Sequence, residues 1–156
     1  MIENDIPPCL IYIDKEGRWF HEGIEMIHRE FIRAFYEKME IDSSGRYIIA
    51  WGDELCYVEV EDTPFVVQRV VFQNRKQDNQ ASYILFLSND SREDLRPDTL
   101  FIRKENVLYC KVKNQRFPAR FTRAAYYELG EYIEEENGVY YLPLNGSRHV
   151  IGEMEE

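Results

Sequence analysis

The residues best suited to chemistry are two arginines at the predicted starts of helices. Arg29 and Arg123 each follow an apolar side chain by two residues, Ile27 in the first case and Phe121 in the second. The positive end of the helix dipole disfavours a cation in the first turn, so a compensating anion is expected there. Backbone N–H groups of the same turn would add donors for a ligand anion. A carboxylate of the chain would serve equally well, and the candidates are Glu22, Glu61 and Asp62.

Conventional catalytic and metal-binding motifs are absent from the sequence. The histidines stand in no HxH or HExxH spacing, and no cysteine lies at a ligand-like interval from them. Nucleophile elbows of the GxSxG type and glycine-rich phosphate loops are missing as well. We therefore expect no metal and no cofactor. If the protein is an enzyme, Glu59 and Glu61 are the acid–base candidates, because a regular strand places both on one face.

The elements that must position the arginines follow one plan twice along the chain. Each copy has a short strand, a basic turn, an amphipathic helix opened by arginine, and a strand that begins with glycine and an aromatic residue. Gly45 corresponds to Gly138, and Tyr47 corresponds to Tyr140. Two copies indicate a duplicated unit rather than a solenoid. Because two packed units leave a seam, we expect a ligand site between them.

An apolar stripe with four-residue steps predicts each helix. In the first helix the stripe comprises Ile27, Phe31, Phe35 and Met39. In the second helix, which is predicted over about 122–136, it comprises Phe121, Ala125, Leu129 and Ile133. Thr122 is the expected N-cap of this helix, and Glu134–Glu136 is its expected solvated end.

Alternating apolar runs predict the strands, and a proline divides them into two groups. Pro64 interrupts any ladder, so residues 1–63 are expected to form an N-terminal α+β subdomain and residues 64–156 a C-terminal one. The fold class is therefore α+β with duplicated strand-helix-strand units. The C-terminal part is predicted to be a curved antiparallel sheet with one helix. The predicted strands are 9–14, 19–20, 47–51, 55–60, 65–72, 83–87, 100–102, 107–112 and 138–142.

Composition restricts the partners and the compartment. A net charge of −10 opposes binding to nucleic acid polymers or anionic membranes. No apolar run approaches the ~20 residues of a membrane-spanning helix, so a cytoplasmic protein is expected. The cysteines are Cys9, Cys56 and Cys110, an odd and widely spaced set that predicts reduced thiols.

Val58-Glu-Val-Glu-Asp-Thr-Pro-Phe-Val-Val67 is the most specific of several segments that carry a family resemblance. The others are Gly17-Arg-Trp19, Glu22-Gly23, Met26-Ile-His-Arg29, Phe35, Asp42-Ser-Ser-Gly-Arg-Tyr47, Ser88-Asn-Asp90, Ala119, Arg123 and Tyr126. Together they resemble the uncharacterised bacterial family known as domain of unknown function 1285, and Asn89 is similar to part of a Thr-Asn motif of that family. The chain departs from the family at Gly138–Pro143, where a Trp-Ser element is usual.

The resemblance implies a duplicated core whose C-terminal part is superficially similar to pleckstrin-homology folds. It also implies a site between the two parts for a nucleotide-like ligand in signalling. We therefore predict a non-catalytic ligand-binding or sensor module for a small anionic ligand. Arg29, Arg116 and Arg123 would bind the anionic groups, Trp19, Trp51 or Phe65 would stack on a base, and Asp62, Thr63 and Asn89 would form hydrogen bonds. The alternatives are a protein-interaction scaffold or homodimer module without a ligand, and an enzyme.

Overall fold

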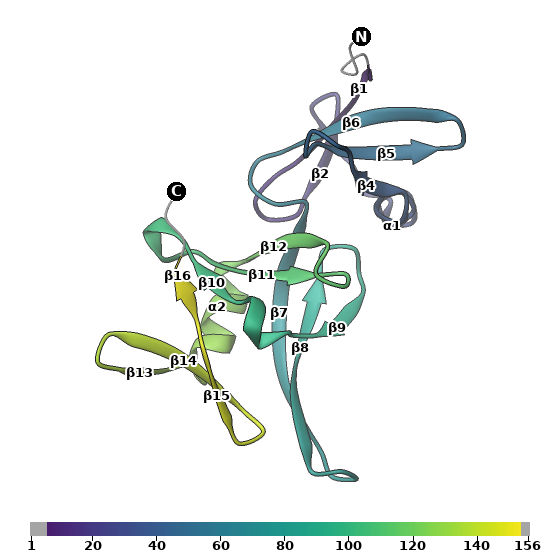
Figure 1. The fold of residues 1–156 in the computed structure, drawn as a ribbon. Helices are drawn as coiled ribbons and strands as arrows, with labels where there is room; N and C mark the ends of the chain where they lie inside the picture. Colours follow the sequence, from purple (N-terminus) through teal and green to yellow (C-terminus); the bar gives the residue numbers. More distant parts are fainter. Residues whose placement is uncertain (1–5, 154–156) are drawn as a thin grey trace. The chain divides into compact units, whose positions relative to one another are not determined.

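The computed structural model describes residues 6–153, apart from the side chain of Lys104. Within this range the chain divides after Pro64 into two compact units (Figure 1). The sequence places the division one residue earlier, after Thr63. Strands predominate in both units, and each unit contains one α-helix. The predicted α+β class is confirmed.

The first unit is a six-stranded sheet with one helix packed on a face. The strand order is β3-β2-β1-β6-β5-β4, and neighbouring strands are antiparallel except for β1 and β6. Tyr36 of the helix is buried against the edge of the Trp19 ring, with ring centres 4.8 Å apart. The elements are β1 (Pro8–Ile13), β2 (Trp19–His21), β3 (Ile24–Glu25), α1 (Arg29–Glu37), β4 (Met39–Ile41), β5 (Tyr47–Trp51) and β6 (Glu54–Val60).

The buried stripe of α1 is not the predicted one. The helix buries Ile32 and Tyr36, whereas Ile27 and Phe31 are 73% and 55% exposed. The predicted stripe was wrong by one residue, because Ile32 and Tyr36, which follow Phe31 and Phe35, are the side chains that face the core. The Tyr36 ring fills the core while its hydroxyl donates a hydrogen bond to the carbonyl oxygen of Pro64 at 2.8 Å. Met39, the last predicted stripe residue, lies on β4.

Two turns of the first unit share one construction. In the turn between β1 and β2, the Asp14 carboxylate accepts hydrogen bonds from the backbone and side chain of Arg18, both at 2.8 Å. In the turn between β4 and β5, Asp42 accepts the same pair from Arg46, both at 2.9 Å. The repeated Asp-x-x-Gly-Arg pattern therefore marks hairpins in which aspartate holds the returning arginine.

The second unit contains a seven-stranded mixed sheet, a three-stranded sheet and one α-helix. The seven strands run in the order β16-β10-β11-β12-β7-β8-β9, with parallel pairs at β7–β12 and β10–β16. The elements are β7 (Phe65–Arg75), β8 (Gln80–Leu87), β9 (Arg92–Asp94), η1 (Pro97–Thr99), β10 (Phe101–Ile102), η2 (Lys104–Asn106), β11 (Leu108–Val112), β12 (Phe117–Phe121), α2 (Arg123–Gly130), β13 (Glu134–Glu136), β14 (Val139–Leu144), β15 (Ser147–Val150) and β16 (Gly152–Glu153).

Helix α2 begins as predicted and ends earlier than predicted. The Thr122 hydroxyl accepts a hydrogen bond from the Ala125 N–H at 3.1 Å, which confirms the N-cap. The helix ends at Gly130, a poor helix former. The predicted helix end at Glu134–Glu136 was wrong, because this segment is a strand paired with β14. Arg148 compensates its charge with ion pairs of 3.6 Å to Glu134 and 2.9 Å to Glu136.

The repeated plan appears in the structure as a helix followed by a three-stranded meander. The meander is β4-β5-β6 in the first unit and β13-β14-β15 in the second. Gly45 and Gly138, the corresponding glycines, both adopt positive φ in the first turn of the meander, at 86° and 82°. A residue with a side chain would be strained there. An antiparallel hairpin precedes each helix, β1–β2 in one unit and β11–β12 in the other.

Candidate functional site

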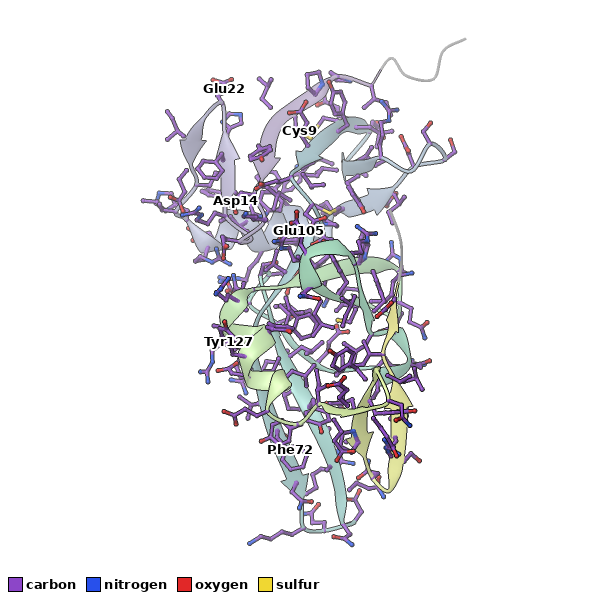
Figure 2. The ribbon with its side chains drawn as sticks, turned by 90° about the vertical axis from the view of Figure 1, so that its left-hand side faces the viewer. Cys9, Asp14, Glu22, Phe72, Glu105 and Tyr127 are labelled. Carbon is purple, nitrogen blue, oxygen red and sulfur yellow. A yellow bond between two sulfur atoms is a disulfide. The ribbon has the colours of Figure 1, made fainter. Side chains whose placement is uncertain are left out.

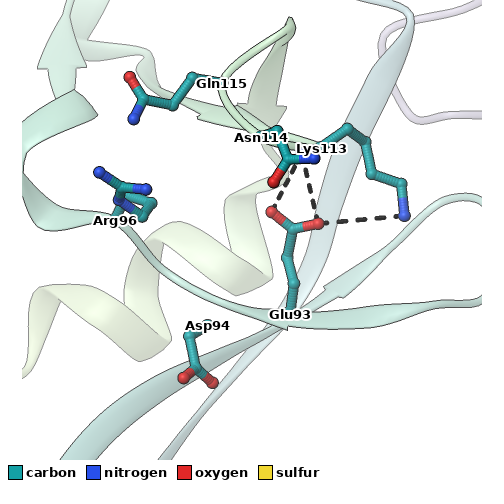
Figure 3. A pocket seen from close by; sticks show the side chains of 6 residues that line it. All are labelled: Glu93, Asp94, Arg96, Lys113, Asn114 and Gln115. Atoms are coloured by element: carbon teal, nitrogen blue, oxygen red, sulfur yellow. Dashed lines mark hydrogen bonds and ion pairs between the residues drawn. The ribbon is translucent and has the colours of Figure 1, made fainter.

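A polar hollow of about 340 Å³ lies in the second unit, beside β9 and the turn between β11 and β12 (Figure 3). Its wall carries two acids, two bases and two amides, so its formal charges balance. Two separate segments supply these groups, one in β9 and just after it, and one in the hairpin before α2. The lining residues are Glu93, Asp94, Arg96, Lys113, Asn114 and Gln115.

Glu93 fixes the β11–β12 turn to β9. Both of its carboxylate oxygens accept a hydrogen bond from the Lys113 N–H, at 3.1 and 3.4 Å. The Lys113 ammonium lies 4.0 Å from the same carboxylate (Figure 3). Both charges of this pair are thus engaged within the protein, and we assign Glu93 and Lys113 a positioning role.

Hydrogen bonds continue from Lys113 to Asn89, one of the predicted site residues. The Lys113 ammonium donates to the Ser91 hydroxyl at 3.3 Å. That hydroxyl donates in turn to the Asn89 side-chain oxygen at 2.6 Å, and the Ser91 N–H reaches the same oxygen at 3.2 Å. Asn89 therefore supports the turn that forms the hollow, and its Oδ1 already has two donors.

The turn itself holds three consecutive residues in the left-handed region. Lys113, Asn114 and Gln115 have φ values of 56°, 58° and 64°, and none of them is glycine. This conformation is unfavourable for residues with side chains, least so for asparagine. The Arg116 N–H closes the turn on the carbonyl oxygens of Val112 and Lys113, each at 3.1 Å. Because the segment contains no glycine, the sequence gives no signal that would predict such a turn.

The groups left for a ligand are Arg96, Asp94 and the two amides. The Arg96 guanidinium has one long ion pair, 3.9 Å to Asp98, and its side chain is 56% exposed. Arg96 and Gln115 lie on the side of Glu93 opposite to the Lys113 ammonium (Figure 3). Guanidinium and amide N–H groups can bind an anion, and the Asp94 carboxylate can accept from a donor on the same molecule.

Five of the predicted site residues belong to the first unit, and the structure separates their roles. Trp19 is fully buried between Phe35 and Tyr36, so its ring belongs to the core and presents no face for stacking. Thr63 is buried as well. The remaining members of this group are Trp51, which is 51% exposed, and Arg29 and Asp62, which are half-buried.

The other four predicted site residues belong to the second unit. Phe65 is buried against Phe117, with ring centres 5.1 Å apart, and is a core residue. Arg123 opens α2 as predicted and lies over the Tyr127 ring at 5.7 Å. Tyr127 is exposed on this helix (Figure 2). Arg116 lies over the Phe117 ring at 5.0 Å. None of the nine predicted site residues lines the hollow. Asn89 and Arg116 contact only the turn that forms its wall, and the predicted site between the units stays a prediction.

The cysteines differ from the sequence-based expectation. Cys9 and Cys56 form a disulfide between β1 and β6, so the prediction that they are reduced thiols was wrong for this pair. The two strands are neighbours in the sheet although 47 residues separate the cysteines, a proximity that their spacing could not reveal. Cys110 is a free, buried thiol, and burial raises its pKa. The cytoplasmic location stays a prediction, and the expectation of reduced thiols no longer supports it for Cys9 and Cys56.

Two further hollows occur in the described part of the chain. One of about 390 Å³ lies in the first unit and is lined by Pro7, Ile49, Trp51, Glu54, Leu55 and Cys56. Another of about 330 Å³ lies in the second unit and is lined by Ile102, Asn106, Tyr126, Gly130, Ile133, Glu135, Tyr140 and Ile151. The acid–base candidates Glu59 and Glu61 are exposed and line none of the three hollows.

Among residues 6–153, no three His, Cys, Asp or Glu side chains are grouped closely enough to hold a metal ion. No helix in the same range has the length and apolar character needed to cross a membrane.

The fold and the hollow define a two-unit α+β protein with a polar candidate ligand site. This fold matches the crystal structure of a DUF1285 family protein from Silicibacter pomeroyi DSS-3, with a TM-score of 0.76 and 18% identity over 95% of this chain and 81% of that one. It also matches a DUF1285 family protein from Shewanella baltica OS155, with a TM-score of 0.62 and 19% identity over 78% of this chain and 91% of that one.

The resemblance seen in the sequence to domain of unknown function 1285 is thereby confirmed at the level of the fold. No family model matches the chain, and no curated protein matches it.

Proposed function

We propose that the protein is a non-catalytic ligand-binding or sensor module that binds a small anionic ligand in the hollow beside β9. The observation that carries this proposal is the meeting of Arg96 with the Asn114 and Gln115 amides around one hollow. The guanidinium would bind the anionic group through paired N–H donors, and the amides would add neutral hydrogen bonds. The ligand would also carry a donor group that reaches Asp94.

The strained turn supports this choice of hollow. Backbone held in unfavourable regions is concentrated at functional sites, because the surrounding structure must maintain it. Here Glu93, Ser91 and Asn89 maintain the turn through the contacts described above. The net charge of −10 slows the approach of an anion but does not prevent binding in a local site that contains arginine.

A thermal-shift screen with nucleotides, amino acids and inorganic phosphate tests the proposal. A ligand should raise the melting temperature of the wild-type protein, since it binds only the folded state. Arg96→Ala should abolish the shift, whereas Arg75→Ala should preserve it. Arg75 is a matched control because it is 50% exposed, pairs with the nearby Asp78, and lies outside the hollow. A shift that survives Arg96→Ala would place the binding elsewhere.

A homodimer module is the second candidate, and an exposed apolar cluster in the first unit favours it. Ile24, Ile27 and Phe31 are 74%, 73% and 55% exposed, near the junction of β3 and α1. Large exposed apolar groups that gather in one place are typical of interaction surfaces. Sedimentation of the wild-type protein and of Ile27→Ser tests this candidate. A monomer at all concentrations would remove it.

A further inference from the structure

A disulfide opens onto the apolar hollow of the first unit. Cys56 contributes to the wall of this hollow together with Trp51 and Leu55, which are 51% and 41% exposed. Its partner Cys9 is half-buried and is absent from the lining residues. Of the two cysteines, Cys56 is therefore the one that a small molecule in the hollow would contact. Figure 2 shows the position of Cys9 in the first unit.

The segment on the Cys9 side of the bond has few other attachments to β6. We call residues 7–9 the strap. Pro7 and Pro8 have no N–H groups to donate, so these two residues can join a strand ladder only through their carbonyl oxygens. Pro8 pairs with Tyr57 of β6, and the Tyr57 N–H donates to the Pro7 carbonyl oxygen at 3.0 Å. The disulfide is the strap's covalent attachment to the same strand.

An irregularity separates the strap from the rest of β1. The register with β6 shifts between Pro8 and Tyr12, and Leu10 has a φ of 65°, an unfavourable value for a residue with a side chain. Beyond this point the ladder with β6 resumes, and the Glu61 N–H donates to the Ile13 carbonyl oxygen at 2.8 Å. Leu10 remains joined to the neighbouring hairpin, since its carbonyl oxygen accepts from the Glu22 N–H at 2.9 Å. Leu10 is thus a natural hinge.

We propose that Cys56 is a site of thiol–disulfide exchange and that exchange releases the strap, which opens the apolar hollow. Pro7 forms part of the hollow wall, so movement of the strap would widen it. The reagent class is a small thiol, and a cationic one suits the site best because Glu54 is the only charged lining residue.

The chemistry needs only the thiol. A thiolate attacks the Cys56 sulfur, a new S–S bond forms there, and the electron pair of the old bond leaves with the Cys9 sulfur, which takes a proton from solvent. A second thiolate can then attack the mixed disulfide at the reagent's sulfur. This step frees Cys56 as a thiolate and yields the oxidised reagent. Two reagent thiols thus supply the two electrons that reduce the protein disulfide.

Cysteamine provides a direct test on the full, oxidised chain under native conditions. After a short exposure, free thiols are blocked with iodoacetamide and the tryptic peptides are identified by mass spectrometry. The proposal expects cysteamine on Cys56 and the alkyl group on Cys9. Cys110 should stay unmodified until the protein is denatured, which makes it an internal control for folding. Cysteamine predominantly on Cys9, or no exchange without denaturant, would overturn the site.

Hydrogen exchange tests the release of the strap. After reaction of the disulfide with cysteamine, the Tyr57 amide should lose its protection from hydrogen exchange, while the Glu61 amide keeps a measurable protection factor. The same result is expected in a Cys9→Ser/Cys56→Ser variant. The Tyr57 amide donates to Pro7 of the strap and the Glu61 amide donates to Ile13 of β1, one on each side of the hinge. Full loss of protection at both would mean that the unit unfolds. Unchanged protection at Tyr57 would mean that the strap stays in place, and either outcome would refute the proposed release.

Discussion

The two units contain the same helix and three-stranded meander but attach the meander in different ways. In the first unit β6 pairs with β1, so a backbone ladder joins the meander to the preceding hairpin. In the second unit β13-β14-β15 is a separate sheet, and side chains contribute to its attachment. The Asn145 side chain accepts from the Ala81 N–H at 2.8 Å and donates to the Ala81 carbonyl oxygen at 3.0 Å. The Tyr83 hydroxyl donates to Pro143 at 2.8 Å.

This difference shows how a duplicated element can change its role. A ladder distributes the attachment over many backbone groups, whereas a few side chains concentrate it in positions that a single substitution can remove. The second unit should therefore have the meander that is easier to detach. Its seven-stranded sheet, which contains β9 and the β11–β12 hairpin, does not depend on a ladder with that meander.

Removal of the Asn145 amide should have the largest effect on this comparison. Asn145→Gly deletes both hydrogen bonds to Ala81 while tolerating the φ of 50° at this position. We expect the free energy of unfolding of the second unit to fall by about 1–2 kcal/mol, at about 1 kcal/mol for each bond. Urea denaturation gives this value, and hydrogen exchange at the Ala81 amide should accelerate.

The matched control is Asp53→Gly in the corresponding turn of the first unit. Asp53 lies between β5 and β6 as Asn145 lies near the junction of β14 and β15, and it is exposed. Both variants carry the entropic cost of a new glycine, but only position 145 has a positive φ that favours glycine. The excess loss in Asn145→Gly is therefore a lower bound on the contribution of the amide bonds. Equal losses in the two units would show that the Asn145 contacts do not attach the meander.

Tyr83→Phe should weaken the same attachment by about 1 kcal/mol, because the Pro143 carbonyl oxygen loses its partner. Burial raises the pKa of Tyr83 to about 12. The neutral phenol is thus favoured in the folded state, and its contribution is complete below the ordinary value of 10.0 and lost as pH rises through about 12. Alkaline unfolding followed by circular dichroism should show this loss in the wild-type protein and not in Tyr83→Phe.

The sequence predicted the repeated plan better than the contacts that complete it. Local apolar patterns located β5, β6 and β14, and residue type located the Thr122 cap. The meander strands β4, β13 and β15 were missed, and the Glu134–Glu136 sequence of β13 has no apolar face. The Cys9–Cys56 bond was missed because it depends on a parallel pairing of distant strands. None of the predicted site residues lines the hollow, since Glu93, Arg96 and the Lys113–Gln115 turn meet through tertiary structure.

The hairpin turns before the two helices extend the comparison. The first turn has glycine at its left-handed position, Gly17 with a φ of 86°, whereas the second has Gln115 at 64°. Gln115→Gly should relieve this strain and raise the free energy of unfolding of the second unit by about 0.5–1 kcal/mol, although it also loosens the unfolded chain. Gly17→Ala should lower that of the first unit by about 1 kcal/mol. Urea denaturation of both variants measures the two changes in the free energy of unfolding. A lower free energy of unfolding in Gln115→Gly would show that the turn is not strained.

The smallest expected effect concerns acid and the turn between β4 and β5. Hydrogen bonds from the backbone and side chain of Arg46 hold the pKa of the Asp42 carboxyl below its usual range, against the opposing effect of desolvation. A carboxyl group whose pKa is lowered by folding contributes fully above its unfolded value of 3.8, and this contribution is lost as pH falls through the lower folded value. Below pH 3.8 the Arg46 amide signal in an NMR titration should therefore shift with Asp42, before the first unit unfolds. The turn between β14 and β15 has no aspartate and should show no such transition, and a shift there at the same pH would mean that acid acts on the whole fold rather than on this carboxylate.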